Sequence, residues 1–166
     1  MGANRVAIGG FMATGKSTTG RLLATRLGLE FIDLDRAVEL HAQKSIQDIF
    51  KQDGEEAFRR IESLVLRDIG QGGPHVVALG GGTLHQPSNT SILRRYRILV
   101  LHTSLLEIQK RLAMDKAERP LSIKAEQLYR QRWPGYRRYG TLLDIEGKMP
   151  RQVVDMMFSA LKDELL

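Results

Sequence analysis

Short apolar runs alternate along the chain with segments that carry apolar residues at helical spacing. The runs occupy residues 6–8, 31–32, 76–79, 98–101 and 142–145. Runs of this length, separated by helical segments, are typical of buried strands in βαβ units. The pattern therefore predicts an α/β fold with three αβα layers, in which helices cover both faces of a mostly parallel sheet.

The segments between these runs predict the helices. Leu22, Leu23 and Leu27 recur at helical spacing after the first run. Ser45 and Asp48 form a capping-box pattern, which indicates that a short helix begins there and reaches about residue 50. The remaining apolar stripes predict helices over residues 54–70, 104–114 and 125–138 and from Pro150 onward.

A phosphate-binding motif follows the first apolar run directly. Residues 10–17 match G-x-x-x-x-G-K-[ST], and a helical segment comes next. A strand that leads into a glycine-rich turn and a helix directs backbone N–H groups at phosphate oxygens, with the lysine on the β- and γ-phosphates and the serine hydroxyl on Mg²⁺. We therefore expect a nucleoside triphosphate to be bound by Gly10, Phe11, Met12, Ala13, Thr14, Gly15, Lys16, Ser17 and Thr18.

Two further clusters follow predicted strands. Asp33 and Asp35 come after the second run, and three glycines at residues 80–82 come after the third. The carboxyl ends of parallel strands meet at one edge of the sheet, where open α/β folds bind ligands. Each cluster also has a purely structural explanation, because an aspartate after a strand often caps a helix and glycines often form a turn.

The composition narrows the function further. The chain has 166 residues, no cysteine, four histidines and a net charge of +6 at pH 7. Without cysteine there are no disulfides and no thiolate metal sites. The basic residues are spread through helical segments, and a cleft that attracts anionic substrates accounts for their excess. We expect small-molecule partners and no nucleic acid, because no aromatic stacking pattern accompanies the basic residues.

The same pattern bears on where the protein works. The apolar runs are far shorter than a membrane span, so we expect no membrane contact. The first predicted strand begins within a few residues of Met1, which leaves no room for a signal peptide. We expect a monomeric cytoplasmic protein.

Six motifs, in order, make the chain resemble the shikimate kinases from end to end. They are the P-loop, D-x-D at 33–35, D-G-E-x-x-F-R-x-x-E at 53–62, G-G-G at 80–82, R-P-L at 119–121 and Y-R at 136–137. The resemblance implies a single domain over residues 1–166, a five-stranded parallel sheet like that of nucleoside monophosphate kinases, and a lid at about 114–124. It also implies ATP-dependent phosphorylation of the 3-hydroxyl of shikimate in aromatic amino acid biosynthesis.

The resemblance also implies which residues bind shikimate. They are Asp35, Arg59, Gly80, Gly81, Gly82 and Arg137. Arg59 and Arg137 would clamp the carboxylate, since a guanidinium donates two parallel hydrogen bonds to it. Asp35 would accept from ring hydroxyls, and the glycine backbone can approach the ring closely because it carries no side chains. Glu62, which matches a family acid, would hold an arginine in place.

For phosphoryl transfer the resemblance implies three catalytic residues, Lys16, Asp33 and Arg119. Lys16 and Arg119 would neutralise the transferring group, and Asp33 would orient or deprotonate the attacking hydroxyl. Ser17 and, through water, Asp33 would hold Mg²⁺. Arg111 matches the family's adenine-stacking arginine, and the loop before Pro150 would cover the other face of the base.

One P-loop position departs from the family pattern. Ala13 stands where glycine is most frequent. If this position requires a positive φ, the alanine costs about 1 kcal/mol. No aspartate ends the 76–79 strand, so the second carboxylate with which generic P-loop ATPases hold magnesium is absent. Its absence is typical of the shikimate kinases.

The residues alone leave three alternatives open. Another small-molecule kinase of the same fold, such as a gluconate kinase, would share the P-loop but does not need paired arginines for a carboxylate. A GTP-dependent switch would need the guanine-reading string N-K-x-D after a strand, which the sequence lacks. A nucleic-acid-binding protein would line one face with phosphate contacts and would bind with a steep dependence on salt.

Overall fold

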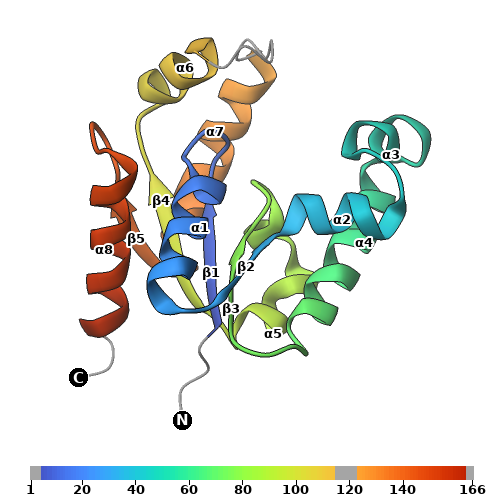
Figure 1. Ribbon diagram of the computed structural model, residues 1–166. Coiled ribbons are helices and arrows are strands. Elements are labelled where there is room, and N and C mark those ends of the chain that lie inside the picture. Colours follow the sequence, from blue (N-terminus) through green and yellow to red (C-terminus); the bar gives the residue numbers. More distant parts are fainter. Residues whose placement is uncertain (1–4, 115–122, 164–166) are drawn as a thin grey trace.

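Five short strands form one parallel sheet in the computed structural model, which describes residues 5–114 and 123–163 (Figure 1). The strands are β1 (Arg5–Gly10), β2 (Glu30–Asp33), β3 (His75–Ala78), β4 (Arg97–His102) and β5 (Thr141–Asp144). They lie in the order β2-β3-β1-β4-β5, and every neighbouring pair is parallel. The expected five-stranded parallel sheet is confirmed.

The helices follow the strands in the alternation that the sequence predicts. They are α1 (Lys16–Leu27), α2 (Leu34–Ala42), α3 (Ile46–Gln52), α4 (Gly54–Ile69), α5 (Thr90–Leu93), α6 (Leu105–Met114), α7 (Ile123–Tyr136) and α8 (Pro150–Asp163). Ser45 caps α3 as expected, since its Oγ accepts from the backbone N of Asp48 at 3.0 Å. The sequence does not predict α2 or α5. None of the described helices is long and apolar enough to cross a membrane.

Each strand divides its side chains between two cores. Ile8, Leu99 and Leu101 face one side of the sheet and pack with α1 and α8, which lie in front of the sheet in Figure 1. Ala7 and Val100 face the opposite side, where the other core contains residues of α2, α4 and α5 to α7. Because successive side chains of a strand point to opposite faces, this division requires helices on both sides.

The carboxyl edge of the sheet is where the predicted site residues meet. β1 lies at the centre between β3 and β4, and the chain crosses over it on the way from β3 to β4. Ligands bind at such crossover points in open α/β sheets. Around this edge, α6 and α7 stand on one side and the group α2 to α4 on the other (Figure 1).

Candidate active site

The loop after β1 has the backbone of a phosphate-binding turn. Gly10 has φ 139°, and a Cβ there would lie 2.6 Å from the carbonyl oxygen of Leu101. Gly15, which precedes α1, has φ 85°. Ala13 also has a positive φ of 59°, so the cost of about 1 kcal/mol that the sequence predicts for alanine applies here.

Lys16 lies back across this turn. Its Nζ donates to the carbonyl oxygens of Gly10 at 3.0 Å and Phe11 at 2.8 Å. The pKa of Lys16 is lowered to about 8, because the effect of burial exceeds the opposing effect of the nearby carboxylates of Asp35 and Asp33. The Lys16 amine is therefore mostly protonated at neutral pH. Its positive charge lies inside the P-loop, next to the backbone that would surround the phosphates.

The other P-loop side chains divide between core and cavity. The ring of Phe11 is buried, edge-on to Tyr129 at 5.4 Å between centroids, so this residue offers only its backbone to a ligand. Thr14 is buried too, and its hydroxyl donates to the carbonyl of Phe11 at 2.7 Å. A cavity of about 330 Å³ is lined by Met12, Ala13, Gly15, Lys16, Ser17, Thr18, Asp33, Asp35, Ala78, Leu79 and Gly81.

Asp33 combines the two roles that the sequence left open. Its Oδ1 accepts from the backbone N of Arg36 at 3.3 Å and caps α2. Its Oδ2 accepts from the hydroxyl of Ser17 at 2.5 Å. One carboxylate therefore begins a helix and also faces the P-loop.

The pairing of Ser17 with Asp33 suits a magnesium ion that arrives with a triphosphate. Mg²⁺ prefers hard oxygen ligands and usually takes one or two from protein, with phosphate oxygens and water completing its shell. Within residues 5–114 and 123–163 no cluster of three or more His, Cys, Asp or Glu side chains could hold a metal ion by itself. The donors present fit Mg²⁺ bound to a nucleotide.

Asp35 faces the cavity from the first turn of α2, next to Gly80. A Cβ at Gly80 would lie 2.9 Å from Asp35 Oδ1 and 3.0 Å from Glu62 Oε1, so any other residue there would displace these carboxylates. Desolvation raises the pKa of Asp35, and the negative charges of Asp33 and Glu62 add to this effect. The site thus gathers carboxylates next to the glycine turn at residues 80–82.

Arg59 lies against the same glycine turn and is held from behind. A Cβ at Gly82 would lie 2.6 Å from Arg59 Nη2, which shows how closely the guanidinium packs there. Arg59 Nη1 donates to Glu62 at 3.0 Å, and Glu62 is fully buried. The hydroxyl of Thr83 donates to the other Glu62 oxygen at 2.7 Å. Glu62 therefore holds an arginine in place, as the sequence predicts.

Arg132 is the site residue that sequence reasoning missed. From α7, its Nη1 lies 3.5 Å from the position of a Cβ on Gly81, and Tyr136, one helical turn later, donates its hydroxyl to the Gly81 carbonyl at 2.6 Å. His85 Nε2 lies 3.1 Å from the Arg132 carbonyl and ties the helix to the same turn. The available signal was the spacing to Tyr136, because residues four apart share a helix face.

Arg137 takes a different direction. It follows the last residue of α7, is exposed, and its guanidinium lies 5.3 Å from the centroid of the Trp133 ring. Within the described residues, its guanidinium is placed at the Trp133 ring and not at the glycine turn. Among the described residues, Arg59 and Arg132 are the arginines at this turn. The assignment of Arg137 to the carboxylate stays a prediction.

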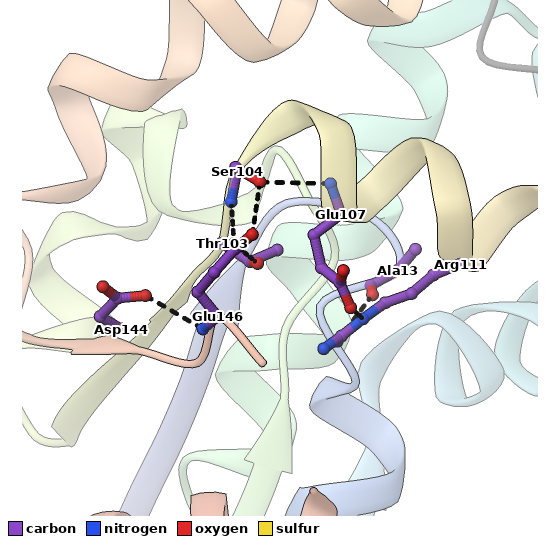
Figure 2. Close-up of polar contacts among 7 residues, drawn as sticks. All are labelled: Ala13, Thr103, Ser104, Glu107, Arg111, Asp144 and Glu146. Carbon is purple, nitrogen blue, oxygen red and sulfur yellow. Dashed lines mark hydrogen bonds and ion pairs between the residues drawn. The ribbon is translucent and has the colours of Figure 1, made fainter. Parts of the chain in front are cut away.

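Arg111 approaches the P-loop from α6 (Figure 2). Its Nη1 donates to the carbonyl oxygen of Ala13 at 3.4 Å, and its Nε donates to Glu107 at 2.9 Å. This position next to the tip of the P-loop suits a wall of a base pocket. The lid residue Arg119 and most of the predicted lid at 114–124 lie outside the described residues.

A sequence profile of the family described as shikimate kinase matches residues 12–162. The chain belongs to the shikimate kinase family. The shikimate kinase of Prochlorococcus marinus (strain NATL2A) is 33% identical over an alignment of 172 positions, which covers 100% of this chain and 87% of that protein. The structure of the shikimate kinase from Acinetobacter baumannii in complex with shikimate matches with a TM-score of 0.87 and 30% identity, over 99% of this chain and 96% of that one.

Membership of the shikimate kinase family answers the question that the P-loop alone left open. It gives the chain shikimate kinase activity, a phosphotransferase reaction of aromatic amino acid biosynthesis, and it implies the use of ATP. A gluconokinase from Sinorhizobium meliloti 1021 matches with a TM-score of 0.65 and 14% identity, over 98% of this chain and 92% of that one. That likeness shows a shared fold alone.

Proposed function

We propose that this shikimate kinase transfers the γ-phosphoryl group of ATP, bound with Mg²⁺, to the 3-hydroxyl of shikimate. The observation that carries the proposal is the pair of guanidinium groups, from Arg59 and Arg132, on the glycine turn beside the P-loop cavity. Paired arginines bind a carboxylate with several charge-assisted hydrogen bonds. The Acinetobacter baumannii relative was solved in complex with shikimate, whose single carboxylate matches this donor set.

The substrate side of the site follows from these contacts. The carboxylate lies between Arg59 and Arg132, and Glu62 keeps Arg59 from turning toward solvent. The bare backbone of Gly80, Gly81 and Gly82 lets the ring come close to the sheet edge. Asp35 accepts a hydrogen bond from a ring hydroxyl on the side that faces the cavity. These contacts hold the 3-hydroxyl toward the P-loop.

The nucleotide side supplies charge and alignment. Lys16 exchanges its bonds to the Gly10 and Phe11 carbonyls for the β- and γ-phosphates, and the N–H groups of the turn donate to the same oxygens. Ser17 and, through water, Asp33 would hold Mg²⁺, which neutralises phosphate charge when bound. Arg119 remains the predicted lid cation.

The reaction then needs one in-line displacement. The 3-oxygen of shikimate forms a bond to the γ-phosphorus as the bond from that phosphorus to the β–γ bridging oxygen breaks, and ADP leaves. Asp33 orients the hydroxyl and accepts its proton, while Lys16 stabilises the developing charge. Because little covalent chemistry falls to the protein, positioning and electrostatics account for most of the catalysis.

An acceptor comparison tests the proposal. ADP release is measured with ATP and Mg²⁺ in the presence of shikimate, shikimate methyl ester, gluconate or no acceptor. We expect fast ADP release only when shikimate is the acceptor. The methyl ester should be a poor acceptor, because it lacks the negative charge that the two arginines bind. Equal rates with the ester and the acid would contradict the carboxylate clamp, and a preference for gluconate would indicate a sugar-acid kinase.

A further inference from the structure

The Glu146 carboxylate connects two parts of the molecule that are far apart in sequence (Figure 2). Its Oε2 accepts from the hydroxyl of Thr103 at 2.5 Å and from the backbone N of Ser104 at 2.8 Å. Its Oε1 accepts from the hydroxyl of Ser104 at 2.8 Å. Three donors at the end of β4 and the start of α6 therefore converge on one side chain of the 145–149 loop.

The loop that carries Glu146 also makes two backbone-donated hydrogen bonds, one to the end of β4 and one within the loop's own segment. The backbone N of Ile145 donates to the carbonyl of His102 at 2.8 Å, and that of Glu146 donates to Asp144 at 3.0 Å. Gly147 then turns the chain with φ 65° before α8 begins at Pro150. Of the described side chains in this loop, Glu146 is the one that makes hydrogen bonds to the start of α6.

A series of hydrogen bonds connects Ser104, through the first turns of α6, to the P-loop. Ser104 Oγ accepts from the backbone N of Glu107 at 3.2 Å and so caps the helix. Glu107 accepts from Arg111, which donates to the Ala13 carbonyl. Figure 2 shows this series of contacts from Glu146 through Ser104 and Glu107 to Arg111. The loop before α8 and the tip of the P-loop are thus joined through α6.

We propose that Glu146 is a positioning residue for the nucleotide base, which holds the 145–149 loop at a set distance from Arg111. The inference rests on the proposed nucleotide site, in which Arg111 and this loop form opposite walls around the base. Because all three donors lie on Thr103 and Ser104, which lead directly into α6, loss of the carboxylate removes the side-chain link between the loop and the helix that carries Arg111. The bond from the backbone N of Ile145 to the His102 carbonyl then remains, and it holds the start of the loop only. The base slot then widens while the phosphate cradle stays intact.

The link persists across the working pH range. The hydrogen bonds from Thr103 and Ser104 lower the pKa of Glu146 to about 2, with Lys110 adding a smaller effect. The carboxylate is therefore ionised throughout the range in which a kinase is assayed, so its effect on base binding will not titrate there.

Two ligands that differ by a nucleoside separate this role from a general one. Binding of ADP and of inorganic pyrophosphate to the free protein is measured for wild type, Glu146→Ala, Glu146→Gln and Thr103→Val. We expect Glu146→Ala to weaken ADP about tenfold and pyrophosphate less than twofold, because the pyrophosphate contacts come from the P-loop. Glu146→Gln keeps one acceptor oxygen and should recover part of the loss. In turnover, the KM for ATP should rise while kcat and the KM for shikimate stay near wild type.

The controls keep the inference separate from the proposed function. Glu56→Ala removes another exposed carboxylate, which pairs with Arg60 at 2.8 Å, and should leave both affinities unchanged. Thr103→Val removes one donor from the opposite side and should give a smaller loss of the same kind, which also covers the case in which Glu146→Ala does not fold. Equal losses for ADP and pyrophosphate, or no loss for either, would overturn the role of Glu146. Failure of wild type to phosphorylate shikimate would instead overturn the proposed function, since the binding comparison uses no shikimate.

Discussion

Replacing Arg132 with alanine gives the sharpest contrast between the site that the sequence implies and the one that the structure describes. Its guanidinium lies at Gly81, whereas that of Arg137 lies over Trp133. Removing one of two arginines leaves a carboxylate under-paired in a partly desolvated cleft. The cost of breaking a buried pair is 3–5 kcal/mol, and Arg132 is half-buried, so we expect about 3 kcal/mol, or over a hundredfold in kcat/KM for shikimate.

The assay is a set of initial rates at varied shikimate and at varied ATP. Arg132→Ala should raise the KM for shikimate strongly and change the KM for ATP little, because the phosphates are bound at the P-loop. Arg137→Ala is the matched control on the same segment and should stay within a few-fold of wild type. Arg132→Lys keeps the charge without the planar fork and should fall between them. A large loss in Arg137→Ala together with a small one in Arg132→Ala would refute the reasoning.

Other contacts give further predictions. Ala13→Gly should raise the melting temperature by about 2–4 °C, because it removes about 1 kcal/mol of strain at φ 59°; calorimetry showing no rise would contradict this strain. Because the pKa of Lys16 is lowered to about 8, kcat/KM for ATP should fall above that pH, and a rate profile that stays flat to pH 10 would be inconsistent with it. Glu62→Ala should lower the free energy of unfolding in urea by about 3 kcal/mol, since it leaves Arg59, 16% exposed, without its buried partner, and Glu62→Gln should lower it less. Burial lowers the pKa of His75, so the folded state favours the neutral imidazole. The free energy of unfolding should therefore keep this contribution above pH 6.5 and lose it as the pH falls below that value. In urea titrations, His75→Gln should make this decline shallower.

Features set by local chemistry were predictable from the sequence. The apolar runs gave all five strands, because strands buried on both faces read as continuous apolar stretches. Ser45 and Pro150 marked helix starts through capping and a fixed φ, and both mark helix starts in the structure. The glycines of the P-loop mark turns that other residues strain to adopt, which is why the one alanine among them could be questioned in advance.

Features set by packing were not predictable in the same way. α2 was not predicted because it is short and buries only Leu34 and Val38, although the carboxylate of Asp33 before it caps a helix. α5 spans four residues, too few to show a period. The spacing of four residues places Arg132 and Tyr136 on one face of α7, but it does not say which face of the helix lies against Gly81. That follows from the tertiary contacts of Tyr136 with Gly81 and of His85 with the Arg132 carbonyl.

The most direct test of the central claim is ³¹P NMR of the product formed from ATP, Mg²⁺ and shikimate. The account predicts one new phosphate monoester, coupled to the single ring proton at carbon 3, together with an equal amount of ADP. Lys16→Ala, folded but without the ammonium that binds the β- and γ-phosphates, should form neither. A phosphate on another hydroxyl, or ADP released at the same rate without shikimate, would contradict the account.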